Sequence, residues 1–189
     1  MTAAAKRRAT YEDLLRVPDH LVAELIDGEL YVMSRPSVPH ATAAAELWCD
    51  IGPPFRRGSG GPGGWIILQE PELHFGGDVL VPDIAGWRRE RMPEDPDASY
   101  IELAPDWVCE ILSPSTRNLD RTIKMEVYAR ESVRHLWHID PATRTLDIFR
   151  LKSGNWTAVA AFSDEAVVRA EPFDAIEISL ARLWTKQRN

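Results

Sequence analysis

The sequence predicts an α/β or α+β fold in which a mixed β-sheet with hairpins is flanked by helices. Two hairpin signals lie in the first half of the chain, at Asp27-Gly28 and at Gly76-Gly77-Asp78. A short apolar run over 107–112 is followed by a helical pattern and then by another strand pattern. This order is typical of a strand–helix–strand crossover, so we expect a sheet in which hairpins precede a single crossover.

The N-terminal elements are predicted from capping and turn residues. Thr10 and Asp13 resemble a capping box, which opens a short helix over 11–16. The remaining strands are expected in β-prone runs bounded by turn residues. The expected strands are 21–26, 29–33, 65–75, 79–87, 107–112, 135–139, 145–151, 155–160 and 167–169.

Two longer helices are predicted from apolar spacing. The Ala-rich segment 40–51 is expected to be helical, and the Gly- and Pro-rich stretch 52–64 after it to be a loop. The helix after the central strand is expected from about 120 to 132, with Asn118 or Asp120 as its cap and Leu119, Ile123 and Val127 on a half-buried face. A short closing helix is expected over 178–183.

Length and charge restrict the class of protein. The chain has 189 residues with 22 Lys and Arg against 29 Asp and Glu, a net charge of −7. We expect a flexible tail over residues 1–9 and a single domain over 10–189. Nonspecific binding of nucleic acid depends on Lys and Arg, so the acidic balance argues against binding by bulk charge and leaves only local basic patches.

Cysteine usage and hydropathy point to an ordinary cytoplasmic protein. Cys49 and Cys109 belong to no CxxC pair, which argues against a zinc site, and both are expected to be buried thiols. No run approaches the roughly 20 apolar residues of a membrane span.

Three residues on the predicted sheet could carry chemistry. Asp83 lies in the apolar run VLVPDIAGW, and Glu110 lies between Val108-Cys109 and Ile111-Leu112. A buried carboxylate costs several kcal/mol unless it is paired or binds a metal. If the two strands are neighbours, about 4.8 Å apart, both acids can converge on one Mg²⁺ ion, with Mn²⁺ as the alternative. Lys124, in the next helix, can lean back toward them and stabilise charge on a phosphate.

The segments VLVPDIAGW, WVCEILSPSTRNLDRTIKMEVYA and VRHLWHIDP resemble the Uma-two family of restriction-endonuclease-like proteins, a branch of the PD-(D/E)XK nuclease superfamily. AELIDGELYVM and His40 are similar to the N-terminal pattern of that family. The resemblance covers about residues 10–160 and implies a restriction-endonuclease-like core, a mixed β-sheet flanked by helices with a Mg²⁺ site.

The resemblance also implies roles for single residues. Asp83 corresponds to the acid of the PD motif and Glu110 to the second acid, so these two are the expected metal ligands. The sequence departs from the superfamily pattern at Leu112, where a lysine is usual, and Lys124 matches the position to which the family moves it. Glu24 corresponds to an accessory catalytic acid.

Further residues are candidates for contacts with substrate. His40, Arg117 and Arg121 are expected near phosphates, and Glu70 or Glu72 could add a metal ligand if either faces the site. Which face of their strand is the metal face stays open.

The leading hypothesis is therefore a Mg²⁺-dependent endonuclease that hydrolyses phosphodiester bonds in nucleic acid, with DNA favoured, and that forms a homodimer. The alternative is a catalytically silent nuclease-fold module that binds nucleic acid or a protein. A third reading, a partner surface built from tryptophans, is weaker, because Trp87, Trp107 and Trp137 fall in predicted strands and fit a core better.

Overall fold

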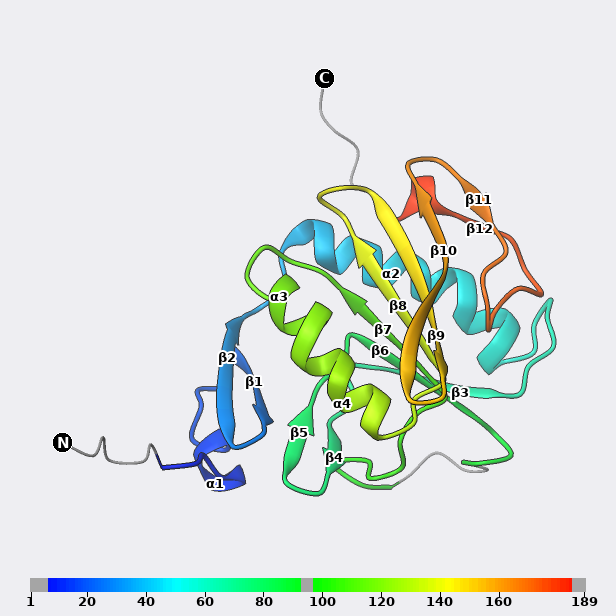
Figure 1. Cartoon of the computed structure of the whole chain (residues 1–189). Coiled ribbons are helices and arrows are strands. Elements are labelled where there is room, and N and C mark those ends of the chain that lie inside the picture. Colours follow the sequence, from blue (N-terminus) through cyan, green and yellow to red (C-terminus); the bar gives the residue numbers. More distant parts are fainter. Residues whose placement is uncertain (1–6, 93–96, 185–189) are drawn as a thin grey trace.

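The computed structural model describes residues 7–92 and 97–184, which form a six-stranded, a four-stranded and a two-stranded β-sheet with helices packed around them (Figure 1). This mixed α and β architecture confirms the predicted fold class. Residues 1–6 of the expected tail lie outside the described part. Arg7 pairs with Asp13, whereas Arg8 and Ala9 contact the first hairpin, where the Arg8 side chain donates to the carbonyl of Asp27 and the Ala9 amide to that of Gly28.

The larger sheet has six strands in the order β10-β9-β8-β7-β6-β3. Its strands are β3 (Trp65–Gln69), β6 (Ile84–Arg88), β7 (Trp107–Ile111), β8 (His135–Asp140), β9 (Thr145–Lys152) and β10 (Asn155–Ser163). Strands β7 and β8 run parallel, and all other neighbours are antiparallel. The predicted crossover and the predicted meander of the last three strands are both confirmed.

The smaller sheet has four strands in the order β2-β1-β5-β4. They are β1 (Leu21–Ile26), β2 (Glu29–Ser34), β4 (Leu73–Phe75) and β5 (Asp78–Leu80). Asp27 and Gly28 have φ values of 52° and 77°, and two left-handed residues in a two-residue turn match the twist of an antiparallel pair. The DG signal therefore identified this hairpin correctly.

The expectation of two uninterrupted strands over 65–75 and 79–87 was wrong. Each is broken, the first at Glu70-Pro71 and the second at Val81-Pro82. A proline has no amide to donate to a strand ladder, and Glu70 has a φ of 46°, which turns the chain away from the sheet. The two halves of each segment consequently join different sheets, and Asp83 lies where the chain passes from one sheet to the other.

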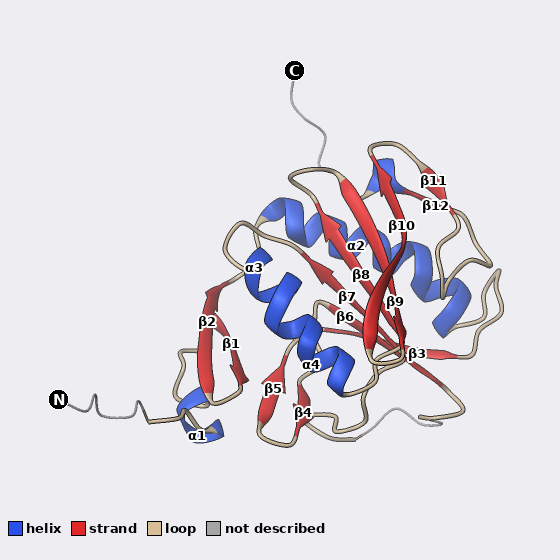
Figure 2. Cartoon of the chain, viewed as in Figure 1, coloured by secondary structure: helices blue, strands red, loops and turns tan. Residues whose placement is uncertain are grey.

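Helices cover both faces of the larger sheet, with α2 (Val38–Ile51) on one and α4 (Met125–Arg130) on the other (Figure 2). The short helix α1 (Tyr11–Leu14) instead packs on β1 of the smaller sheet. The remaining helical segments are η1 (Gly52–Arg56), α3 (Arg117–Leu119), η2 (Asp120–Lys124) and η3 (Leu180–Arg182). α3, η2 and α4 follow one another without a break, with η2 forming a wide π-helical turn. Thr116 lies at the N-terminal boundary of this segment, so neither Asn118 nor Asp120 is its cap.

Two smaller predictions about helices also need correction. The expected loop from residue 52 begins with the π-helical turn η1, in which the amide of Arg57 donates to the carbonyl of Gly52. Pro53 and Pro54 cannot donate the usual helical hydrogen bonds, which favours this wider turn. The expected closing helix is shorter, because Ile178–Ser179 form strand β12, paired with β11 (Val167–Val168), before η3.

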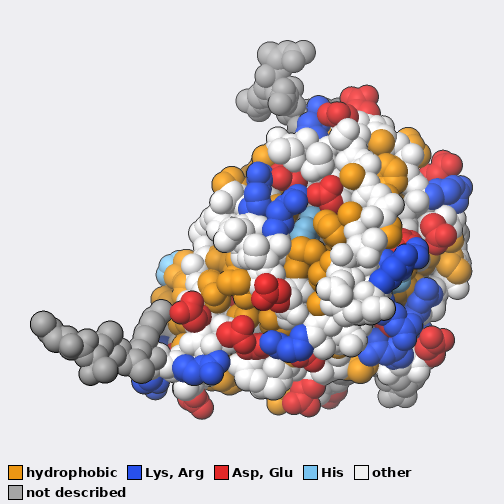
Figure 3. Space-filling model, viewed as in Figure 1, with side chains coloured by type: hydrophobic (Ala, Val, Ile, Leu, Met, Phe, Trp, Pro, Cys, Tyr) orange, Lys and Arg blue, Asp and Glu red, His pale blue; other side chains and the backbone are white. Residues whose placement is uncertain are grey.

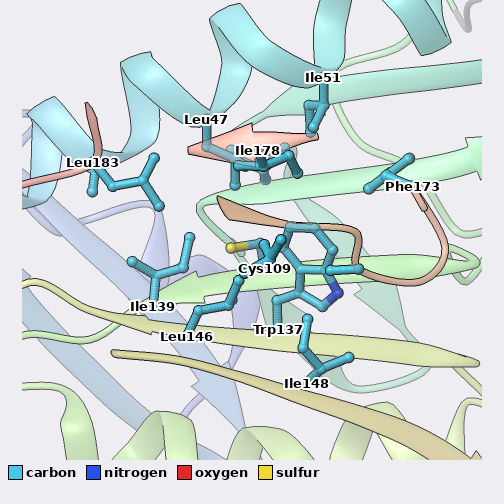
Figure 4. Close-up of a cluster of buried hydrophobic side chains, with 14 of the residues drawn as sticks. Leu47, Ile51, Cys109, Trp137, Ile139, Leu146, Ile148, Phe173, Ile178 and Leu183 are labelled. Carbon is cyan, nitrogen blue, oxygen red and sulfur yellow. The ribbon is translucent and has the colours of Figure 1, made fainter. Parts of the chain in front are cut away.

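The core lies on both faces of the central strands. α2 packs on one face through Leu47 and Ile51, against side chains such as Cys109, Trp137 and Ile139 (Figure 4). α4 packs on the opposite face through Val127 and Tyr128, in a second cluster. The side chains of β7 alternate between these faces, as expected for a strand buried on both sides.

Burial confirms most of the expected core. Trp87, Trp107 and Trp137 are fully buried, as expected for core residues. Cys109 is buried but Cys49 is exposed, so the expectation of two buried thiols was wrong for Cys49, which lies on the outer side of α2. Among the described residues, no helix is both long and apolar enough to cross a membrane.

Candidate active site

A cavity of about 500 Å³ lies beside the junction of the two sheets. Its lining includes Glu24 from β1, His40 from α2, Asp83 from the passage between sheets, Glu110 from β7 and Lys124 from η2. The structure thus brings together five of the residues singled out in the sequence, although they come from five separate segments of the chain.

Lys124 and Glu110 form the buried centre of this site. Lys124 Nζ lies 2.9 Å from Glu110 Oε1, and the two residues are 3% and 2% exposed. Burial alone would lower the pKa of Lys124, but the charges of Glu110 and Glu24 outweigh it and raise this pKa well above its usual value. Lys124 is therefore a fixed positive charge.

The π-helical turn brings Lys124 to this position. A wide turn shifts the facing of the residues within it, and such turns are frequent at functional sites. Leu119 before the turn and Val127 after it both pack in the core beneath, so Lys124 is held against the sheet. Lys124 was expected to lean back toward Glu110 from the helix that follows it. Lys124 does reach Glu110, but from a π-helical turn and not from a regular α-helix.

Glu24 is the counter-ion of Lys124 from the smaller sheet. Its Oε1 lies 2.9 Å from Lys124 Nζ and accepts a hydrogen bond of 2.7 Å from the amide of Val81. Its Oε2 is buried and has no hydrogen-bond partner. Burial raises the pKa of Glu24.

Both oxygens of the Asp83 carboxylate have partners. Oδ2 accepts a hydrogen bond of 2.6 Å from the amide of Ile111, and Oδ1 lies 3.1 Å from His40 Nε2. The first of these contacts places Asp83 next to the backbone that carries Glu110. Burial would lower the pKa of His40, but its hydrogen bond and charge interaction with Asp83 raise this pKa overall.

Two further residues belong to the site. Asp120, which we expected to be a helix cap, instead lies with its Oδ1 3.4 Å from Lys124 Nζ, and burial raises its pKa. Tyr128 is not among the site residues expected from the sequence, yet its hydroxyl donates to Glu110 Oε1 at 2.5 Å. Both lie four positions from Lys124 in the chain, the spacing of neighbours on one helix face, and this is the signal that could have identified them.

The two arginines expected at phosphates lie elsewhere. Arg117 Nη2 is 2.7 Å from Asp140 Oδ2, and Arg121 Nη2 is 2.8 Å from Asp147 Oδ2. Neither is among the residues that line the cavity. Leu112 is 2% exposed and packs as an apolar residue, so the ammonium group of the site comes from Lys124 alone among the described lysines.

Glu70 and Glu72 both border the cavity, although the strand on which they were placed is broken between them. Glu70 is exposed at the bend. Glu72 accepts hydrogen bonds from the Tyr11 hydroxyl at 2.9 Å and pairs with His74 at 2.6 Å.

The donor set of the cavity suits a hard cation better than a soft one. Asp83, Glu110 and Glu24 supply carboxylate oxygens, the ligands that Mg²⁺ prefers. Glu24, Glu110 and Asp120 contact the one lysine of the site. Burial, and to a smaller extent the charges of Asp120, Asp83 and Glu24, raise the pKa of Glu110 well above its usual value. No group of three or more His, Cys, Asp or Glu in residues 7–92 and 97–184 is arranged to hold a metal. Mg²⁺, however, commonly uses only one or two carboxylates and keeps several waters.

Comparison with known proteins identifies the family of the chain. A family model described as "Uma2: Putative restriction endonuclease" matches residues 9–181. The chain belongs to the Uma2 family. The match spans nearly the whole chain and includes every acid of the site, as well as Lys124 and Tyr128.

A solved structure shares the fold of this Uma2 protein. It is described as a putative nuclease of the family DUF820 from Anabaena variabilis ATCC 29413, with a TM-score of 0.70 and 23% sequence identity. The alignment covers 92% of this chain and 96% of that one. No curated protein matches the chain.

Proposed function

We propose that this chain is a metal-dependent endonuclease that hydrolyses phosphodiester bonds in nucleic acid, with DNA as the expected substrate. The observation that carries the proposal is the convergence of Asp83, Glu110 and Lys124 at one cavity. The two acids lie together because the carboxylate of Asp83 binds the amide next to Glu110. Lys124 contacts Glu110 directly.

Asp83 and Glu110 would hold a Mg²⁺ ion, with Mn²⁺ as the alternative. When bound, a divalent cation supplies Lewis-acid polarisation of a phosphate oxygen and lowers the pKa of water. The fit rests on the carboxylate donor set and on the unpartnered, buried Oε2 of Glu24, which point to a missing positive charge.

The protein side chains would have separate roles in the hydrolysis. Lys124 keeps its proton and offers a fixed positive charge to the oxygens of the phosphate during attack. His40 orients the carboxylate of Asp83 through Nε2, and a contact from this histidine to a phosphate is a further proposal. Glu24 holds Lys124 in place from the smaller sheet.

The decisive experiment measures Mg²⁺ binding by calorimetry and cleavage of labelled oligonucleotides by the wild-type protein and Asp83→Asn. Asparagine keeps the shape of the side chain and loses its charge. We expect metal binding to weaken and the rate to fall by about 100-fold or more. Lys152→Met is the control, since Lys152 is exposed on β9, outside the site.

A second candidate is a silent nuclease-fold module. The specific observation in its favour is that Lys124 already binds three carboxylates, so that its charge is largely satisfied without a phosphate. If the wild-type protein binds no divalent metal and nicks neither single- nor double-stranded substrates, the endonuclease proposal is wrong and the silent module is favoured.

A further inference from the structure

The groups of the site are set deep in the cavity. Glu24, Glu110 and Lys124 are 1%, 2% and 3% exposed. A phosphate can approach them only by entering the cavity with its neighbouring groups. The phosphates of a regular duplex lie along a stiff rod, whereas a single strand can bend and turn a nucleotide inward.

The lining of the cavity is unfavourable to the flanking phosphates of a duplex. Beyond the buried acids it includes Asp19, Glu70 and Glu72, which we call the acidic rim. The three basic residues of the lining already have partners. Arg35 donates to the carbonyl of Asp19 at 2.6 Å, His40 contacts Asp83, and Lys124 pairs with buried acids. On the face shown in Figure 3, basic and acidic side chains are interspersed, without the continuous basic band on which duplex binding relies.

One side of the same cavity is apolar. Leu14, Leu15, Val17, Val22 and Met33, which we call the apolar wall, come from α1 and the segment after it and from the first hairpin. Leu15 is 63% exposed, although it is a large apolar side chain beside the cavity. Apolar surfaces of this kind accept the face of a nucleobase that has left its stack.

We propose that the cavity takes an unstacked, single-stranded segment of nucleic acid, with a base against the apolar wall, in preference to a regular duplex. This inference rests on the proposed nuclease function and specifies its substrate class. A volume of about 500 Å³ suits such an occupant, because it lies in the range of pockets that enclose small molecules.

The test compares one labelled sequence as a single strand and as a blunt duplex. Binding is measured by fluorescence anisotropy with EDTA present, and cleavage is measured separately with Mg²⁺. We expect the single strand to bind about tenfold more tightly than the duplex and to be cut faster. Equal or tighter binding of the duplex overturns the inference.

Two substitutions examine the wall and the rim. Leu15→Glu places a charge on the apolar wall at an exposed position, where folding tolerates it, and should weaken binding of the single strand about tenfold. The matched control is Val32→Glu, since Val32 is another exposed apolar residue, 47% exposed on strand β2 and outside the cavity lining. Asp19→Lys removes part of the acidic rim and should improve binding of the duplex more than that of the single strand.

The outcomes separate this inference from the proposed function. If the duplex is cut as fast as the single strand and Leu15→Glu changes nothing, the substrate class is wrong while the nuclease function stands. If nothing is cut but the single strand still binds selectively through Leu15, the hydrolytic function fails and the binding preference stands.

Discussion

At the scale of single residues, Tyr128 fixes the position of the Glu110 carboxylate. Its hydroxyl is fully buried and donates to the same oxygen of Glu110 that Lys124 contacts. Burial and the nearby charge of Glu110 raise the pKa of Tyr128 well above its usual value, so the hydroxyl remains a donor. Glu110 therefore has two fixed neighbours on one oxygen, and its orientation depends on both.

Tyr128→Phe should remove this hydrogen bond and little else. We expect the free energy of unfolding to fall by about 1–3 kcal/mol, since the bond involves a charged acceptor, and Mg²⁺ affinity to fall as Glu110 gains freedom. Denaturant unfolding and calorimetry measure the two effects. Tyr31→Phe is the control, because the hydroxyl of Tyr31 makes only a long, exposed contact of 3.5 Å to Glu29. Equal effects of the two variants would contradict a special role for Tyr128.

The candidate site shows what residue types and spacing can predict. Asp83 and Glu110 were identifiable because a charge inside an apolar run needs an explanation, and Lys124 because it lies in the helix that follows Glu110. The surroundings of Arg117 and Arg121 were not, since their partners Asp140 and Asp147 lie on strands more than twenty positions later in the chain. Sequence patterns report on local geometry, and these ion pairs depend on tertiary packing.

Strand β6 shows how one element is adapted to a tryptophan core. A Cβ atom added to Gly86 would lie 3.2 Å from the ring of Trp107 and 3.3 Å from that of Trp65. Both distances are shorter than ordinary van der Waals contact. The glycine therefore lets two large rings pack on the same stretch of strand.

Gly86→Ala should consequently lower the free energy of unfolding by about 1–2 kcal/mol, because the added methyl group overpacks the core. Chemical denaturation measures this change. Gly77→Ala provides the comparison, since a Cβ there meets nothing within 4 Å, and it should alter stability by less than about 0.5 kcal/mol. A smaller loss for Gly86→Ala than for Gly77→Ala would show that the rings move aside.

The elements differ in how far the sequence determines them. The hairpin at Asp27-Gly28 follows from two residues that accept left-handed geometry, and the sequence was sufficient to predict it. The break at Pro82 was missed because apolar residues lie on both sides of it. The break at Pro71 was missed because Glu70 and Glu72 fit alternating positions of one strand. Hydrophobicity marked these segments as buried, but only the assembled fold shows that their halves join two sheets.

At the scale of the whole molecule, the stability of the fold in acid depends in part on His135. Burial and the nearby Arg150, Arg88 and Arg134 lower the pKa of His135 to about 4, while Asp106 acts in the opposite direction. Unfolding restores the pKa to about 6.5. Between these values the unfolded chain binds a proton that the folded chain does not, so stability decreases as the pH falls from 6.5 toward 4.

His135→Gln should reduce this pH dependence. In the wild-type protein, His135 lowers the free energy of unfolding by up to about 2 kcal/mol between pH 7 and pH 5. The variant lacks this titration, so its free energy of unfolding should fall less over the same range. Urea unfolding between pH 7 and pH 5 measures it, with the exposed His20→Gln as control. The raised pKa values of Glu24, Glu110 and Asp120 act in the opposite sense, so the comparison with wild type is what tests the effect. Parallel curves for wild type and His135→Gln would refute it.

The three-way contact of Lys124 has a consequence for how the molecule opens. Glu24 belongs to the smaller sheet and Glu110 to the larger one, and a single buried ammonium group joins them. Any fluctuation that lifts the first hairpin away must strip this cation of one counter-ion and leave a carboxylate uncompensated. Local unfolding of the N-terminal hairpin is thereby tied to dismantling of the site, and hydrogen exchange should find the amides of β1 protected together with those of β7.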